Sequence, residues 1–136
     1  MKRALIAFLG SAFVLFVGLS IAAGPLFAHH GRGASYDESK VVTVKGTVTE
    51  WAWRNPHVAL YVDVPDANGK VVNWGFESQN VSSLSRLGMS RNSFRPGQEI
   101  TIKFNPSRAG AAVGVIRKVY DAAGKEILSF GGPIDQ

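Results

Sequence analysis

The chain has 136 residues, of which 46% are hydrophobic and 18% are charged, and its formal net charge is +5. This length fits one ordinary domain, and the composition is typical of a globular protein rather than a disordered one. The chain contains no cysteine, which excludes disulfides, thiolate metal sites and cysteine nucleophiles.

Residues 1–28 have the layout of a secretory signal peptide. Lys2 and Arg3 precede an uncharged, mostly apolar stretch over residues 4–23, and the small residue Ala28 ends the segment. We expect cleavage after Ala28 and a periplasmic protein with a formal charge of +3, because only Lys2 and Arg3 are lost from 15 basic and 10 acidic residues. The alternative is a membrane anchor formed by residues 4–23, since about 20 apolar residues can span a bilayer.

Residues 29–40 are polar and rich in glycine, and we expect a flexible polar arm there. A single domain over residues 41–136 follows. Its first predicted strand covers residues 41–53, in which Val48 and Trp51 are large apolar residues of opposite parity. Successive side chains of a strand alternate between its two faces, so this change of parity predicts a β-bulge near residues 49 and 50.

The next two strands can be aligned from their alternation alone. Apolar residues occupy every second position of 57–64 and of 71–77. Opposed residues of an antiparallel pair share a face. A two-residue turn would mix the apolar and polar faces, whereas a three-residue loop at 67–69 places Val62 opposite Trp74. The alternation therefore predicts a hairpin with the three-residue loop.

A short helix is predicted over residues 81–87, where apolar residues recur at every third position between the N-cap Asn80 and Gly88. Three further strands are predicted at 99–104, 112–120 and 125–130. The fold class is therefore all-β with one short helix. Three strands, a helix and two or three strands are the order of an OB-fold, a small Greek-key barrel. A small β-sandwich is the competing architecture.

The three histidines form a candidate metal site. Cleavage after Ala28 would make His29 the N-terminal residue, and its amine, its imidazole and the imidazole of His30 suit copper, zinc or nickel. The predicted register brings His57 beside Glu77, and a carboxylate can fix the tautomer of a histidine or share a metal with it. Copper is the first ion to test. Histidines that bind nothing are the alternative.

A docking surface for another envelope protein is the second functional hypothesis. Trp51, Trp53 and Arg54 are of the residue types that dominate interfaces, and with Glu77 they are the candidate contacts for a ligand or partner. Binding of single-stranded nucleic acid is the third hypothesis, but export and the low charge after cleavage argue against it. The sequence contains no phosphate-binding glycine loop or nucleophile elbow, so we expect a binding protein and not an enzyme.

Several motifs follow one another along the chain: Ala28-His29-His30, Trp53-Arg54-Asn55-Pro56-His57-Val58, Asn73-Trp74-Gly75-Phe76-Glu77 and Phe94-Arg95-Pro96-Gly97. This series resembles a widespread bacterial family of small exported proteins of unknown function. The resemblance covers nearly the whole chain after residue 28, and the Asn-Pro-His-Val corner is its most specific part. It implies export and a small β-rich fold, and it implies no particular activity.

Overall fold

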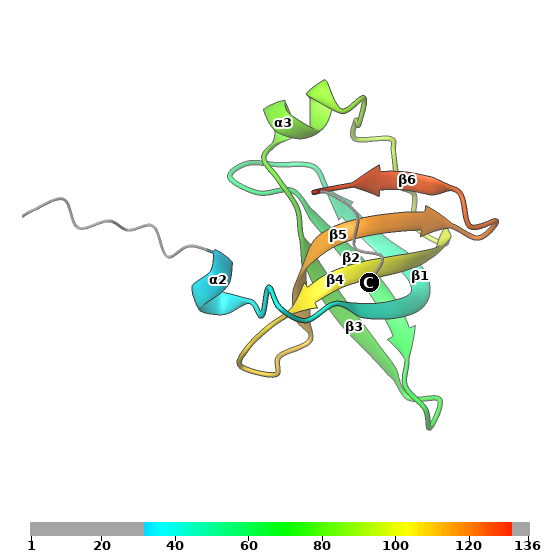
Figure 1. Cartoon of the computed structure of the whole chain (residues 1–136). Coiled ribbons are helices and arrows are strands. Elements are labelled where there is room, and N and C mark those ends of the chain that lie inside the picture. The colour runs from blue at the N-terminus through cyan, green and yellow to red at the C-terminus, as the bar shows by residue number, and fades with distance from the viewer. Residues whose placement is uncertain (1–31, 132–136) are drawn as a thin grey trace, which may run out of the picture. The chain divides into compact units, whose positions relative to one another are not determined.

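The computed structural model describes residues 32–131. The signal peptide predicted over residues 1–28 and the pair His29-His30 lie outside the described residues. The elements in chain order are α2 (Arg32–Ser35), β1 (Val42–Ala52), β2 (Ala59–Pro65), β3 (Val71–Glu77), α3 (Val81–Arg86), β4 (Glu99–Pro106), β5 (Val113–Asp121) and β6 (Glu126–Ser129), as Figure 1 shows.

Strands β1 to β5 close into a barrel. The order in the sheet is β3-β2-β1-β4-β5-β6, and a parallel pairing between β3 and β5 joins the two ends of the five-stranded part. This connectivity, with α3 between β3 and β4, is that of an OB-fold. The predicted OB-like Greek-key barrel with one short helix in the domain is therefore confirmed, and the β-sandwich is not observed. Strand β6 extends the barrel wall beyond β5.

The predicted bulge lies in β1. The pairing of β1 with β2 shifts between Val48 and Glu50, so Thr49 is the additional residue. The shift turns the side chains of Val48 and Trp51 to the same side, and both are buried, at 1% and 9% exposure. The bulge thus lets one long strand contribute to the barrel core on both sides of its bend.

The β2–β3 hairpin has the predicted register. Val62 lies opposite Trp74, and the connecting loop consists of residues 67–69. The amide of Gly69 donates to the carbonyl oxygen of Asp66 over 3.0 Å. Gly69 adopts a φ of 79°, a conformation that glycine reaches without steric cost.

The core fills the barrel, and α3 packs against it. The helix begins after Asn80, whose side chain accepts a hydrogen bond from the amide of Ser83 over 2.9 Å. The helix buries Leu84 completely, and Gly88 follows its end with a φ of 81°. The largest fully buried side chains are Phe76, Phe104, Leu60, Leu84, Ile100 and Ile102. No helix within residues 32–131 is long and apolar enough to cross a membrane.

Residues 32–40 of the polar arm are bound to the barrel, which differs from the flexible segment expected there. Tyr36 forms a β-bridge with Ser107, and the amide of Asp37 donates to the carbonyl oxygen of Pro106 over 2.9 Å. The arm therefore continues the edge of the sheet at the end of β4. Its polar sequence hides this role, because backbone groups make the pairing.

Candidate functional site

His57 lies in the loop between β1 and β2, directly after Pro56. The hairpin sets its position, since the pairing of Ala59 with Glu77 brings the loop beside the end of β3. Nδ1 of His57 lies 2.9 Å from Oε1 of Glu77, as the predicted register requires. A carboxylate oxygen can only accept, so Nδ1–H donates this bond and the neutral imidazole carries its lone pair at Nε2.

Glu77 has a second neighbour that the sequence reasoning missed. The hydroxyl of Tyr36 donates to Oε2 of Glu77 over 3.1 Å. One carboxylate thus joins a loop histidine to a tyrosine from the arm. The available signal was composition, because Tyr36 is the single aromatic residue among residues 29–40, and an aromatic ring is stabilised by apolar contact.

Further hydrogen bonds hold the arm where Tyr36 reaches Glu77. Asn105 is 4% exposed, and its Nδ2 donates to the carbonyl oxygen of Lys40 over 2.7 Å. Nε of Arg108 donates to the carbonyl oxygen of Gly33 over 3.0 Å. The two ends of the arm are therefore attached to Asn105 in β4 and to Arg108 just after it.

Asp37 contributes an electrostatic contact to the same segment. The hydroxyl of Ser39 donates to Oδ1 of Asp37 over 2.7 Å. This bond, the amide of Ser39, and the cations Arg108 and Lys40 hold the pKa of the Asp37 carboxyl below its usual value. The nearest Arg108 nitrogen lies 3.7 Å from Oδ1. The ionised form of Asp37 is therefore the form that the bound arm favours.

The Tyr36–Glu77–His57 group borders a groove of about 250 Å³, which we call the histidine groove. Tyr61 lies across Gly75 on its floor, where a Cβ on Gly75 would stand 3.3 Å from the Tyr61 ring. The remaining walls come from Ala59, Phe76 and Val113. The groove thus lies on strands β2 and β3, between the β1–β2 and β4–β5 loops, which is the face and loop pair that OB-folds use for ligands.

The described residues include only one of the three predicted metal ligands. The side chain of His57 is 51% exposed at the histidine groove, whereas His29 and His30 lie outside the described part. Within residues 32–131 no group of three His, Asp or Glu side chains is placed to hold a metal ion. His57 alone does not complete a site, since zinc and copper take three or four protein ligands in most proteins.

Trp51, predicted as a candidate contact for a ligand or partner, is 9% exposed and belongs to the core. Its ring packs edge-on against Phe94 at a centroid distance of 5.0 Å, and its Nε1 donates to the carbonyl oxygen of Ser90 over 2.9 Å. The physical reason is the bulge at Thr49, which turns Trp51 inward. Alternation predicts the bulge, but it does not say whether the ring of Trp51 turns toward the core.

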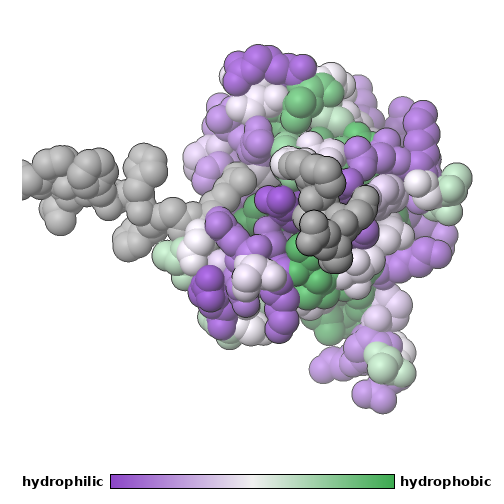
Figure 2. Space-filling view, viewed as in Figure 1, coloured by the Kyte–Doolittle hydropathy of each residue, from purple (hydrophilic) through white to green (hydrophobic). Residues whose placement is uncertain are grey.

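The other predicted contacts are more accessible. Trp53 is partly buried, and its ring lies against Trp51 at a centroid distance of 5.6 Å. Arg54 is exposed and lies 3.5 Å from Glu50 on the same bend. Figure 2 shows hydrophobic residues in small groups between hydrophilic ones on the visible face. Trp53 and Arg54 are therefore more accessible than Trp51, and their contact with a partner stays a prediction.

A family model matches residues 17–117, nearly three-quarters of the chain. The chain belongs to a family of unknown function, DUF6152. This agrees with the resemblance drawn from the sequence motifs. The family description names no activity, so a function has to be argued from the chemistry of the site. No curated protein matches the chain in sequence.

Solved structures with a similar fold include the mitochondrial single-stranded DNA binding protein Rim1 from S. cerevisiae. One crystal form is 9% identical with a TM-score of 0.46 and covers 69% of this chain and 98% of its own. A second form is 10% identical with a TM-score of 0.44 and covers 61% and 94%. At this distance we base the fold on the strand pairing and draw nothing about ligands from Rim1.

Proposed function

We propose that this DUF6152 member is an exported binding protein of the bacterial envelope that holds a transition metal through His57, His29 and His30. Copper is the first candidate metal, and we propose no catalytic role. The motif series, the apolar stretch before Ala28 and the position of the histidine groove on the ligand face of an OB-fold support this proposal.

The observation that carries the proposal is the hydrogen bond between His57 and Glu77, 2.9 Å long. Histidines that bind metals almost always donate their other ring N–H to a carboxylate, a carbonyl or a water, and the partner orients the ring and raises its basicity as a ligand. Here the carboxylate takes Nδ1–H and leaves Nε2 for a metal. The bond from Tyr36 to the other oxygen of Glu77 further restricts the carboxylate.

The remaining proposed ligands precede the arm in the sequence. Tyr36 is bound at Glu77, and His30 precedes Tyr36 by six residues. We propose that the imidazoles of His29 and His30 supply further ligands to the ion held by Nε2 of His57, and that the N-terminal amine of a cleaved chain adds a fourth nitrogen.

Calorimetric titration of the exported protein with Cu(II) tests the proposal, after N-terminal sequencing has shown that the chain begins at His29. We expect binding tighter than about 100 µM and its loss in His57→Ala. Glu77→Gln should weaken it by about 10- to 100-fold. Tyr61→Phe alters the same groove without touching a ligand and should change nothing. A protein that releases no binding heat with Cu(II), Zn(II) or Ni(II) would contradict the proposal.

A further inference from the structure

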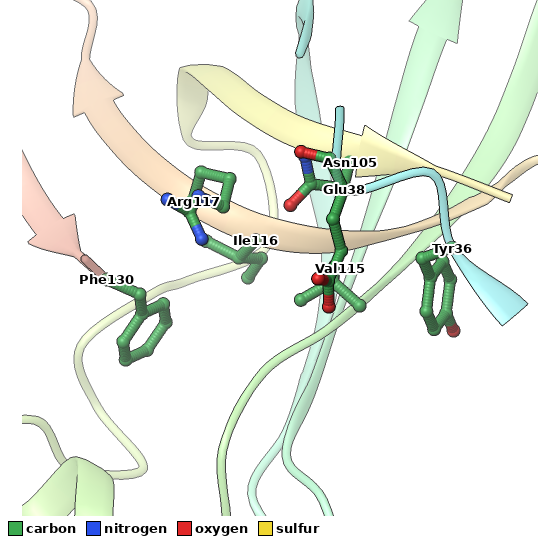
Figure 3. Close-up of a pocket in the computed structure, with 7 residues that line it drawn as sticks. All are labelled: Tyr36, Glu38, Asn105, Val115, Ile116, Arg117 and Phe130. Atoms are coloured by element: carbon green, nitrogen blue, oxygen red, sulfur yellow. The ribbon is translucent and has the colours of Figure 1, made fainter. Parts of the chain in front are cut away.

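A second cavity lies beneath the arm, on the other side of Tyr36 from the histidine groove. Its volume is about 90 Å³, several times the ~10–15 Å³ that one water molecule needs. Figure 3 shows Arg117 and Phe130 on one side of it and Tyr36 on the other, with Glu38, Asn105 and Val115 drawn between them. We call this space the arm cavity.

Arg117 is the unusual residue of the arm cavity. It is partly buried on β5, and within residues 32–131 it forms no ion pair. Its Nε is enclosed and has no hydrogen-bond partner in that part of the chain. Arginine side chains are seldom buried without a partner, because the desolvated charge is costly. The guanidinium therefore has hydrogen-bonding capacity that the described protein does not use.

The glycine after Phe130 makes room for this guanidinium. A Cβ at Gly131 would stand 2.9 Å from Nη2 of Arg117, closer than real side chains allow. Gly131 also has a φ of 89°, which disfavours any other residue. The backbone just after β6 thus approaches the guanidinium of Arg117 closely.

Another wall of the arm cavity carries the opposite charge. Glu38 comes from the arm, and its exposed carboxylate lines the cavity without an ion pair to Arg117. Val115 and Asn105 also line the cavity, whereas the side chain of Ile116 is 1% exposed and belongs to the barrel core. The cavity therefore offers a cation, an anion and the apolar side chain of Val115.

We propose that the arm cavity binds a small zwitterion, a molecule of amino-acid size with one carboxylate and one ammonium group. The carboxylate accepts two parallel hydrogen bonds from Arg117, the geometry that a guanidinium favours, after a side-chain rotation turns Nε–H toward the cavity. The ammonium group donates to Glu38. The carbon atoms between them pack against Val115.

This binding is independent of the metal proposal. Tyr36 borders both cavities, but Arg117 and Glu38 have no part in the histidine groove. A metal titration observed at His57 and a zwitterion titration observed at Arg117 can therefore fail separately.

The Nε–H signal of Arg117 in a ¹⁵N–¹H correlation spectrum is a direct probe, because an enclosed Nε–H exchanges slowly enough to be seen. We expect β-alanine or glycine to shift this signal at concentrations up to about 10 mM. Acetate lacks the ammonium group and ethylamine lacks the carboxylate, so each should bind at least about tenfold more weakly. These four probes separate recognition of both charges from recognition of one.

Two variants assign the charges, and a third is the control. Arg117→Lys keeps the positive charge but loses the two-pronged donor, and Glu38→Gln changes an exposed residue, so its fold is preserved even if Arg117→Lys is unstable. Each should weaken β-alanine binding about tenfold or more, as followed by the backbone amide of Ile116. Arg95→Gln removes an exposed charge on the loop after α3 and should have no effect. The proposal is overturned if β-alanine shifts no signal, if acetate binds equally well, or if Glu38→Gln binds like the parent.

Discussion

The β2–β3 hairpin and the polar arm carry the two halves of the candidate site, and they are held in different ways. In the hairpin, Val62 and Trp74 are opposed because side chains alternate along both strands and a three-residue loop joins them. In the arm, Tyr36 reaches Glu77 across 41 residues of sequence. The hairpin follows from local rules, whereas the arm depends on partners that only the closed barrel assembles.

The hairpin and the arm should therefore differ in stability. The hairpin belongs to the cooperative core, in which Phe76 is fully buried. The arm is attached by a few hydrogen bonds from Asn105, Arg108 and Tyr36. Segments with few buried apolar contacts open more easily than the core. We therefore expect changes in the hairpin to affect global unfolding and changes in the arm to affect local opening.

The largest effect should come from Phe76→Ala. Phe76 lies opposite Leu60 in the hairpin and packs edge-on against Phe104 at a centroid distance of 4.9 Å. Its truncation should lower the free energy of unfolding by about 3–5 kcal/mol, measured by urea denaturation. Phe76→Leu keeps most of the volume and should cost less than about 1.5 kcal/mol. Equal losses in the two variants would contradict a packed core at this position.

A smaller loss is expected from Gly69→Val in the hairpin loop. A Cβ at Gly69 would meet no atom within 4 Å, so its φ of 79° is the only constraint. The variant should lose roughly 1–2 kcal/mol of stability, measured in the same urea experiment. Lys70→Val places the same side chain one residue later, where φ is negative, and should be nearly neutral. Similar losses from both would mean that side-chain size, and not φ, limits this loop.

The difference in predictability has the same origin as the difference in stability. Register, bulge, helix caps and the contact of His57 with Glu77 follow from alternation and turn chemistry within about 25 residues. These rules locate Thr49 as the bulge, but they do not say which flanking tryptophan turns inward. That choice depends on Phe94 and Ser90, which contact Trp51 from the loop after α3.

The arm could not be predicted for a further reason. Asn105 lies in β4, and its amide is used to bind the carbonyl oxygen of Lys40, 65 residues earlier. Backbone carbonyls are present at every residue, so the sequence of the arm does not mark which ones are bound. Tyr36 and the arm cavity next to it were therefore missed, although Glu77 and His57 were identified.

Tyr36→Phe removes one hydroxyl from the arm. The loss of its hydrogen bond to Glu77 should cost about 0.5–1.5 kcal/mol, and hydrogen exchange should increase at the amides of residues 36–40 more than in β2 and β3. Tyr61→Phe is the matched control, because Tyr61 lies on the same groove within the hairpin. Uniform exchange changes across the barrel in Tyr36→Phe would show that the arm is not a separate unit.

The smallest effect concerns acid, and it acts on the arm alone. The pKa of Asp37 is lowered in the folded protein, first by the hydroxyl of Ser39 and then by its amide and by Arg108 and Lys40. A carboxyl with a lowered folded pKa stabilises the bound arm above its unfolded pKa, near pH 4. That contribution is lost as the pH falls through the folded pKa. Asp37 is close to solvent, so screening keeps the contribution small.

The amide of Ser39 reports this titration, because it donates to Oδ1 of Asp37 over 3.3 Å. Its resonance should move as the pH falls below about 4, together with faster motion of residues 36–40 in ¹⁵N relaxation, while the amides of β2 and β3 keep their positions. Asparagine cannot ionise, so residues 36–40 of the Asp37→Asn variant should be about as mobile at neutral pH as at about pH 3. An Asp37→Asn arm that still loosens only in acid would assign the effect to another carboxyl, and Glu77, bound to Tyr36, would be the next to replace.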